Sequence, residues 1–337
     1  MDRSKINNNL KMIKLISIVG PTASGKTALG VYLAKKFNGE IISADSRQVY
    51  KFMDVGTGKD LKEYKKVKYH CIDIVNPTIN FNLAKYVKYT KPVIAKVYKK
   101  NKLPFLVGGT GLYINAITEN YNLNEEKVDK NYRKELESKT KLELQRITAS
   151  IFKKNKIENP LNNSDWNNPY RLIRFIEKNK SGYKKDTKDN KEYKNLIIGI
   201  NPNKEIIKEK ISKRLNVRFE NEDMLKEVWN LRYKHNVSWK KIISFGLEYK
   251  FIGTFLKDNK KYFLKNKKLL DIKQLEKSEL KNKYLKMKDE LNNEIVYFAK
   301  KQMTWFNKNK NIIWLSGDKK NIYKNAEKLV KNFIKTK

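Results

Sequence analysis

The sequence is poor in the residues that crosslink secreted proteins or hold structural metals. Its 337 residues include one cysteine, Cys71, and two histidines, His70 and His235. A single cysteine cannot form an internal disulfide, and two isolated histidines do not indicate a metal site. We expect Cys71 to pack in a strand beside His70.

Long apolar stretches are also missing. No apolar run approaches 18 residues, and no basic segment precedes a cleavable apolar one. The apolar stretch 12–19 is too short to cross a bilayer. We therefore expect a soluble cytoplasmic protein without membrane contact, and we expect it to act as a monomer.

Acidic residues are scarce relative to basic ones. The chain has 36 acidic and 75 basic residues, a formal net charge of +39, which favours a polyanionic partner such as nucleic acid. However, only nine of the 75 basic residues are arginine, and lysine, asparagine and isoleucine recur everywhere, including the segment 307–311. A coding bias produces such a spread, so the alternative is a solvated lysine-rich surface.

What the sequence does contain is a complete phosphate-binding loop. Residues 20–27 read Gly-Pro-Thr-Ala-Ser-Gly-Lys-Thr and lie between an apolar run, 15–19, and a helical pattern, 27–37. Glycines let backbone N–H groups turn toward phosphate oxygens, and the helix N-terminus adds its positive dipole end. The residues expected to bind a diphosphate or triphosphate are Gly20, Thr22, Ala23, Ser24, Gly25, Lys26 and Thr27. Lys26 would reach the outer phosphates and Thr27 would ligate Mg²⁺.

Strand-like runs alternate with helical patterns over most of the chain. The further runs are 40–44, 69–74, 104–107, 196–200 and 311–315. This alternation predicts an α/β fold with a parallel sheet.

The strand signal disappears between residues 118 and 195. Charged helical segments such as 127–140 and 170–178 replace it, and 182–195 is a polar connector without an apolar period. We therefore expect a helical insertion over 118–195, inside a core built from 1–117 and 196–337.

Two loops that follow predicted strands carry candidate catalytic groups. Asp45 follows the strand 40–44, and ligands of parallel α/β sheets gather at the carboxyl ends of strands. Its carboxylate could accept a proton from a nucleophile or bind Mg²⁺, and the alternative is a helix cap. The glycine-rich turn 108–111 follows another strand and offers the hydroxyl of Thr110.

Two segments combine cations, amides and aromatic rings. In 168–174, Arg171 and Arg174 lie three residues apart on one predicted helix face, which suits two phosphates of a nucleic-acid strand. The segment 298–306 mixes lysines, a glutamine and aromatic rings, a combination typical of single-stranded RNA binding. The alternative for both is an amphipathic helix with its apolar residues in the core.

Taken together, the ordered motifs resemble the tRNA dimethylallyltransferases, also called tRNA isopentenyltransferases. The match spans nearly the whole chain, and the phosphate-binding loop alone would not be specific. The segments that carry the resemblance are 20–27, 43–50, 54–59, 107–113, 169–174, 245–249 and 299–306.

This resemblance implies a P-loop NTPase-like core and a helical insertion that grips the tRNA anticodon stem-loop. The exocyclic amine of the adenine 3′ of the anticodon would attack carbon 1 of dimethylallyl diphosphate, and diphosphate would leave. Asp45 would be the general base, with Lys26, Thr27 and Mg²⁺ at the diphosphate. The residues implied to contact tRNA are Asp45, Ser46, Arg47, Gln48, Thr110, Arg133, Tyr170, Arg171, Leu172, Ile173 and Arg174.

Other functions remain open from the residues alone. A small-molecule kinase uses the same loop for phosphoryl transfer. An isopentenyltransferase acting on free adenine nucleotide is a second alternative, against which the insertion and the segment 299–306 argue. A non-catalytic RNA-binding module is a third, and it would leave Asp45 without a purpose.

Overall fold

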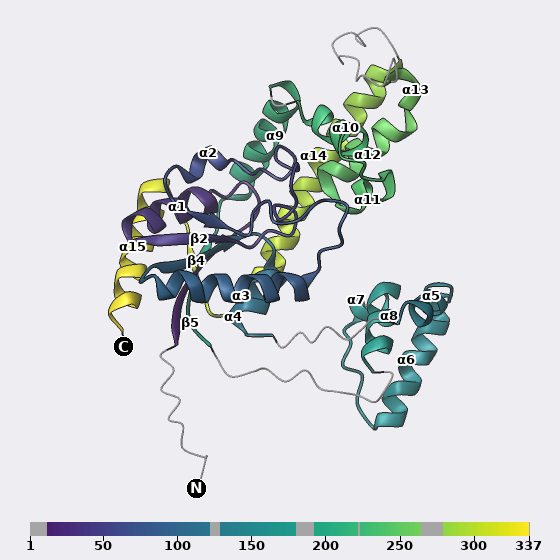
Figure 1. The fold of residues 1–337 in the computed structure, drawn as a ribbon, viewed down its shortest axis with the longest axis horizontal. Helices are drawn as coiled ribbons and strands as arrows, with labels where there is room; N and C mark the ends of the chain where they lie inside the picture. Colours follow the sequence, from purple (N-terminus) through teal and green to yellow (C-terminus); the bar gives the residue numbers. More distant parts are fainter. Residues whose placement is uncertain (1–11, 122–128, 180–191, 222, 264–278, 337) are drawn as a thin grey trace. The chain divides into compact units, whose positions relative to one another are not determined.

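The computed structural model describes residues 12–121, 129–179, 192–221, 223–263 and 279–336 (Figure 1). The chain divides into two compact units. One unit combines Met1–Asn120 with Asn190–Lys337, and the other is Tyr121–Asp189. Among the described helices, none is both long and apolar enough to cross a membrane.

The larger unit is built on a parallel sheet in the order β3-β2-β4-β1-β5-β6. The strands are β1 (Ile13–Val19), β2 (Gly39–Ser43), β3 (Tyr69–His70), β4 (Leu103–Gly108), β5 (Tyr193–Ile200) and β6 (Ile312–Leu315). All paired strands run parallel, so each connection must cross over the sheet. The α/β fold class predicted from the alternating runs is confirmed.

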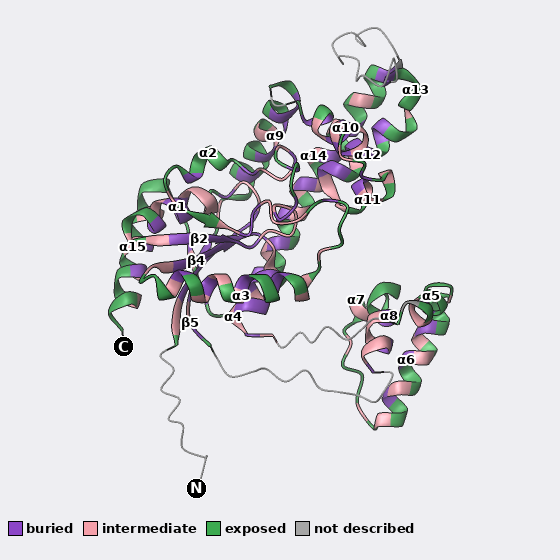
Figure 2. Ribbon diagram, in the orientation of Figure 1, coloured by how far each residue is buried: buried purple, intermediate pink, exposed green. Residues whose placement is uncertain are grey.

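Helices cover this sheet because its central strands are apolar on both faces. They are α1 (Lys26–Lys36), α2 (Leu61–Tyr64), α3 (Leu83–Lys99), α4 (Gly111–Thr118) and α15 (Lys319–Lys335). Ile16, Ile18, Phe105 and Ile198 are buried in one cluster with Leu29 of α1. Figure 2 shows buried residues along the strands and exposed residues on the outer helix faces.

A group of helices follows β5 and belongs to the same unit. It comprises α9 (Lys204–Glu220), α10 (Met224–Tyr233), α11 (Trp239–Ser244), α12 (Leu247–Asp258), α13 (Lys260–Phe263) and α14 (Glu279–Phe306). Helix α14 contacts α9 and α12 in this group, and it also contacts α4 beside the sheet. Helix α14 therefore links this group of helices to α4, which follows the end of β4.

The smaller unit is helical in its described part. It contains α5 (Lys130–Glu137), α6 (Lys141–Asn155), α7 (Asn163–Trp166) and α8 (Pro169–Lys178). Helix α8 begins after Asn168, whose side chain accepts a hydrogen bond from the N–H of Arg171, and Pro169 occupies the first helical position. The unit has its own apolar core, which includes Leu136, Leu144 and Ile176.

Two predicted segments differ from the structure. The strand expected over 69–74 ends at His70, because Cys71 and Asp73 have φ angles of 63° and 55° that a β-ladder cannot accommodate. Cys71 is buried beside the Thr90 hydroxyl, in a loop and not in a strand.

The start of β5 also differs from the prediction. Residues 193–195, assigned from their polarity to the connector 182–195, form the first part of β5 and pair with 13–15 of β1. Backbone pairing fixed this segment where side-chain patterning gave no signal. Residues 182–191 of that connector, and residues 127 and 128 of the predicted helix 127–140, lie outside the described ranges.

Candidate active site

The phosphate-binding loop lies where the sequence predicts it, between β1 and α1. Gly25 has a φ of 85°, and a Cβ on Gly20 would lie only 2.9 Å from Ser24 Oγ. Glycine is therefore required at both positions, for conformation at Gly25 and for space at Gly20. The hydroxyl of Ser24 is buried and has no hydrogen-bond partner among the described residues, so the loop contains an unsatisfied polar group.

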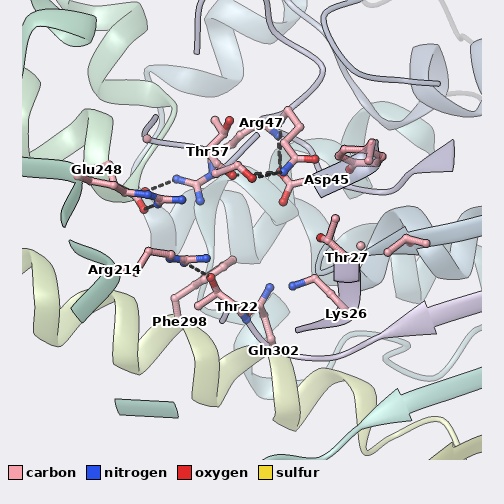
Figure 3. Close-up of a pocket in the computed structure, with 17 residues that line it drawn as sticks. Thr22, Lys26, Thr27, Asp45, Arg47, Thr57, Arg214, Glu248, Phe298 and Gln302 are labelled. Atoms are coloured by element: carbon pink, nitrogen blue, oxygen red, sulfur yellow. Dashed lines mark hydrogen bonds and ion pairs between the residues drawn. The ribbon is translucent and has the colours of Figure 1, made fainter. Parts of the chain in front are cut away.

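A pocket opens beside this loop at the carboxyl ends of the strands (Figure 3). Residues from the sheet loops and from α9, α12 and α14 line it together. They are Thr22, Lys26, Thr27, Asp45, Arg47, Gln48, Gly56, Thr57, Gly58, Tyr64, Val107, Gly108, Arg214, Arg218, Glu248, Phe298 and Gln302. The pocket brings Asp45 and the phosphate-binding loop together, as predicted from their strand ends.

Positive charge exceeds negative charge in the pocket lining. Lys26 and three arginines face only the two carboxylates of Asp45 and Glu248. Glu248 is buried and bonds Arg47 at 2.5 Å, and Arg218 Nη1 lies 3.8 Å from its other oxygen. Burial alone would raise the pKa of Glu248, but these guanidinium groups hold it below its usual value. Lys26 and Arg214 are left with Asp45 as the only other carboxylate in the lining. Their positive charges are therefore not fully neutralised, and the pocket suits a polyanion.

Lys26 is one of the cations that this arrangement leaves poorly compensated. Its Nζ donates to the carbonyl oxygen of Pro21 at 3.1 Å. Burial lowers the pKa of Lys26 to about 8, Asp45 opposes that shift, and Arg214 adds to it. A phosphate oxygen at Nζ would stabilise the charged form and raise this pKa.

Arg214 is the second poorly compensated cation. Its Nη2 donates to the Thr22 hydroxyl at 2.6 Å, and it forms no ion pair with any residue that the structure describes. Burial and the neighbouring charge of Arg218 lower the pKa of Arg214 to about 10, so it stays charged at neutral pH. A half-buried cation at the phosphate-binding loop is a ready contact for a phosphate group.

Asp45 has one oxygen engaged in its own loop. Its Oδ1 accepts hydrogen bonds from the N–H of Arg47 at 2.9 Å and of Gln48 at 3.3 Å. These bonds resemble the capping alternative, yet no helix begins there. Oδ2 has no hydrogen bond to any described residue, while the side chain lines the pocket. The carboxylate is thus fixed through one oxygen and open to a ligand through the other.

Gln302 of α14 joins two loops of the pocket. Its Oε1 accepts from the N–H of Thr22 at 2.8 Å, and its Nε2 donates to the carbonyl oxygen of Gly109 at 2.9 Å. These two partners fix the orientation of the amide, because one can only donate and the other can only accept. The N–H of Thr22, expected to face phosphate, is therefore already bonded.

The pocket offers oxygen donors that fit Mg²⁺. The Thr27 hydroxyl and the Asp45 carboxylate line the same pocket, and the Thr27 hydroxyl forms no hydrogen bond within the described ranges. No group of three or more His, Cys, Asp or Glu residues that could hold a metal occurs among the described residues. Magnesium usually keeps water and takes phosphate oxygens besides one or two protein ligands, so these two residues suit it only together with a phosphorylated ligand.

The loop 45–48 and Thr110 lie together, although not all their side chains are free. Thr110 Oγ1 accepts from the N–H of Ser46 at 3.1 Å, which ties the two strand-end loops to each other. Gln48 Nε2 donates to the carbonyl oxygens of Thr57 and Gly58, at 3.3 and 3.2 Å. Arg47 bonds Glu248, so Arg47 and Gln48 build the pocket wall.

In the smaller unit, the predicted RNA-binding arginines have carboxylate partners. Arg133 Nε lies 2.9 Å from Glu177, Arg174 Nη1 lies 3.5 Å from the same carboxylate, and Arg171 pairs with Asp165. These ion pairs engage all three arginines with carboxylates of the same unit.

The apolar and aromatic residues of α8 separate into two sets. Tyr170 is 67% exposed, and the Arg133 guanidinium lies 5.7 Å from its ring centroid. Leu172 and Ile173 are buried in the core of the unit, so their side chains are not available to RNA. For these two residues, the amphipathic-helix alternative replaces the predicted contact.

Several pocket residues were not assigned a role from the sequence. Arg214 and Arg218 lie four residues apart on α9, hence on one helix face. Only nine of the 75 basic residues are arginine, so two arginines at that spacing could have indicated a functional helix face. Glu248 and Gln302 fell within motifs that carried the resemblance, but nothing local to them indicated their partners.

Comparisons with known proteins identify the family of this chain. A family model described as IPP transferase matches residues 48–309. The chain is 39% identical over 304 residues to tRNA dimethylallyltransferase 1 of Parabacteroides distasonis, covering 88% of this chain and 89% of that protein. It is 33% identical over 318 residues to tRNA dimethylallyltransferase 1 of Syntrophus aciditrophicus, with coverage of 91% and 95%.

Solved structures give the same result. The tRNA isopentenylpyrophosphate transferase of Bacillus halodurans is 30% identical, with a TM-score of 0.65 and coverage of 95% of this chain and 96% of that one. A eukaryotic dimethylallyltransferase acting on tRNA, at 18% identity and a TM-score of 0.71, shares the fold over 96% of this chain and 79% of that one. This chain belongs to the IPP transferase family.

Proposed function

We propose that this chain is a tRNA dimethylallyltransferase. It transfers the dimethylallyl group of dimethylallyl diphosphate to the exocyclic amine of the adenine 3′ of the anticodon, and it releases diphosphate. The observation that carries the proposal is a single pocket in which an open carboxylate, Asp45, faces the poorly neutralised cations Lys26 and Arg214. One group can take a proton while the others hold a departing anion.

The cationic side of the pocket is proposed to bind the diphosphate of the donor. Lys26, Arg214 and Arg218 supply positive charge where negative charge develops as the leaving group departs. Mg²⁺ bound by the diphosphate and the Thr27 hydroxyl would add further charge neutralisation. The loop therefore holds a leaving group and not a phosphoryl donor.

The acidic side of the pocket is proposed to activate the acceptor. The amine nitrogen forms a bond to carbon 1 of the donor while the bond from that carbon to the diphosphate oxygen breaks. The amine proton passes to Asp45, whose Oδ1 is held by two backbone N–H groups while Oδ2 stays open. This geometry keeps the base in place without using up its proton-accepting oxygen.

The adenine must leave its stack to reach this carboxylate, as bases do in other nucleobase-modifying enzymes. Ser46 and Thr110, bonded to each other beside Asp45, are proposed to contact the displaced nucleotide. Tyr170, Arg133, Arg171 and Arg174 of the smaller unit are proposed to contact the anticodon stem-loop. We further propose that the enzyme acts as a monomer in the cytoplasm.

The alternative functions are less consistent with the family. The relatives that match over about nine tenths of the chain carry the name tRNA dimethylallyltransferase, at 33% and 39% identity. A kinase would transfer phosphate from ATP, and an enzyme for free nucleotides would prenylate AMP. Neither activity is favoured by these names.

The test is an incubation of the purified protein with labelled dimethylallyl diphosphate, Mg²⁺ and one acceptor at a time. We expect label in unmodified tRNA, none in free AMP, and none without acceptor. Equal labelling of AMP would replace the tRNA assignment, and phosphoryl transfer from ATP in a parallel incubation would favour the kinase. Omitting Mg²⁺ should greatly slow the transfer to tRNA.

A further inference from the structure

One wall of the pocket is a loop without regular secondary structure. Gly56, Thr57 and Gly58 line the pocket, and the residues from 51 to 60 form turns that include no helix or strand. The N–H groups of Gly58 and Lys59 bond carbonyl oxygens within the loop, but the other N–H groups need partners elsewhere, because no ladder or helix supplies them. The shape of this wall therefore depends on other parts of the chain.

A carboxylate of α10, Glu227, supplies those partners. Its Oε2 accepts from the N–H of Asp54 at 2.7 Å and of Val55 at 2.6 Å, and its Oε1 accepts from the N–H of Gly56 at 3.0 Å. The Tyr249 hydroxyl donates to Oε1 at 2.8 Å. Four donors thus converge on one side chain, which does not itself line the pocket.

Burial and the converging donors have opposite effects on the pKa of the Glu227 carboxyl. Burial raises the pKa of its carboxyl, while the hydrogen bonds from the loop and from Tyr249 oppose that shift. A neutral amide could not take over the role, because it has one acceptor oxygen and its NH₂ group would face N–H donors. A carboxylate is therefore the group that this site requires.

The loop in turn fixes groups that face the ligand. Gly58 lies against the guanidinium of Arg218, since a Cβ at Gly58 would be 2.4 Å from Arg218 Nη2. Gln48 holds the carbonyl oxygens of Thr57 and Gly58 from the other loop. A shift of this wall would therefore change the space available to Arg218 and Gln48.

We propose that Glu227 is a positioning residue for the diphosphate end of the pocket. It holds the backbone of 54–56, and through that loop it keeps Gly58 and Arg218 in the arrangement that receives the anion. This inference rests on the proposed function for the identity of the ligand. It adds a residue outside the pocket on which donor binding depends.

The test compares Glu227→Gln with Asp223→Asn, a matched change from carboxylate to amide on the same helix. Asp223 is the N-cap of α10 and accepts from the N–H of Lys226, a role that asparagine fills equally well. Two quantities are measured in each purified variant. They are hydrogen exchange of peptides covering 50–58 and the affinity for inorganic diphosphate with Mg²⁺ by calorimetry.

We expect Glu227→Gln to speed exchange at 54–56 and to weaken diphosphate binding about tenfold or more, because buried donors lose their charged acceptor. KM for the donor should rise by a similar factor, with a smaller change in kcat and an unchanged affinity for tRNA. Asp223→Asn should leave all of these at wild-type values. Faster exchange in Glu227→Gln with unchanged diphosphate affinity would overturn the proposal and leave only a structural role.

A milder variant keeps the test decisive if Glu227→Gln does not fold. Tyr249→Phe removes one donor and leaves the carboxylate with its three backbone bonds, so we expect an intermediate loss of diphosphate affinity. No loss in this folded variant would also count against the proposal. Failure of the wild-type protein to bind diphosphate would contradict the proposed function instead, and hydrogen exchange would still show whether Glu227 holds the loop.

Discussion

Arginine is used differently in the two units of this protein. In the pocket of the larger unit, Arg214 touches the phosphate-binding loop without an ion pair to any described residue, and Arg47 and Arg218 share one carboxylate, Glu248. In the smaller unit, Arg133 and Arg174 share Glu177, and Arg171 pairs with Asp165. The pocket is short of negative charge, whereas these arginines of the helical unit have carboxylate partners.

This difference indicates how each region would bind an anion. A ligand entering the pocket meets cations that are partly desolvated and fixed in place, so each contact is strong. A nucleic acid reaching the helical unit must compete with Glu177 and Asp165 for arginines whose side chains are 25–48% exposed, so each contact is weaker and sensitive to salt. Substitutions in the pocket should therefore have large effects, and substitutions in the helical unit small ones.

The largest expected effect comes from Asp45. Asp45→Asn keeps an oxygen that can accept from the backbone of the loop but removes the base, so turnover should fall by about two to four orders of magnitude. Binding of both substrates should change little, and single-turnover kinetics with prebound substrates separates the two. Asp318→Asn, which alters the N-cap of α15, is the control. Near-normal turnover of Asp45→Asn would show that Asp45 only shapes its loop.

Arg214 should have the next largest effect. Arg214→Ala removes the cation that lacks a carboxylate partner, so affinity for dimethylallyl diphosphate should fall roughly tenfold to a hundredfold, the range for a charged hydrogen bond. The affinity for tRNA should stay the same. Arg146→Ala, a change of the same type in the helical unit, serves as the control. An unchanged donor Kd in calorimetry would remove Arg214 from the proposed anion site.

Sequence analysis found the phosphate-binding loop and Asp45 but missed Arg214 and Gln302. The phosphate-binding loop is contiguous, and Asp45 follows β2, which only β4 separates from β1 in the sheet, so local pattern and topology were enough. Arg214 and Gln302 lie about 190 and 280 residues from Thr22, their hydrogen-bond partner. The local sequence does not predict these hydrogen bonds to Thr22, because they depend on how α9 and α14 pack.

In the helical unit, sequence analysis predicted the helix but missed the contacts that its side chains make. Arg171 and Arg174 were placed on a helix face correctly, yet the sequence did not reveal that Asp165 and Glu177 accept their guanidinium groups. Leu172 and Ile173 were assigned to RNA through the resemblance, although apolar residues between arginines commonly form a core face. The family identification itself rested on motifs along the whole chain, and it is confirmed.

Lys26 allows a prediction about pH. With a pKa of about 8 in the free protein, Lys26 is charged below pH 8 and loses its proton above it. A bound diphosphate raises this pKa and so favours the charged form. Donor affinity should therefore be constant below about pH 7, roughly twofold weaker at pH 8 and about tenfold weaker near pH 9, the consequence of one linked proton. Calorimetry from pH 6.5 to 9 measures this.

Lys26→Met provides the control for the pH experiment. This variant should bind the donor weakly at every pH and should lack the decline above pH 8. Titration of the ligand itself would appear equally in both proteins and can be subtracted. The same decline in Lys26→Met and wild type would assign the pH dependence to the ligand and not to Lys26.

Arg174 should show the smallest effect, and it tests whether the helical unit contributes specific contacts at all. Because Arg174 is half-buried and lies 3.5 Å from Glu177, which it shares with Arg133, a phosphate would replace only one weak ion pair. Arg174→Ala should raise KM for tRNA by a few fold and reduce the slope of log affinity against log salt by about one. Donor affinity should not change. Lys154→Ala on α6 of the same unit removes equal charge, so an equal loss of tRNA affinity would indicate diffuse electrostatics and contradict the assignment of Arg174.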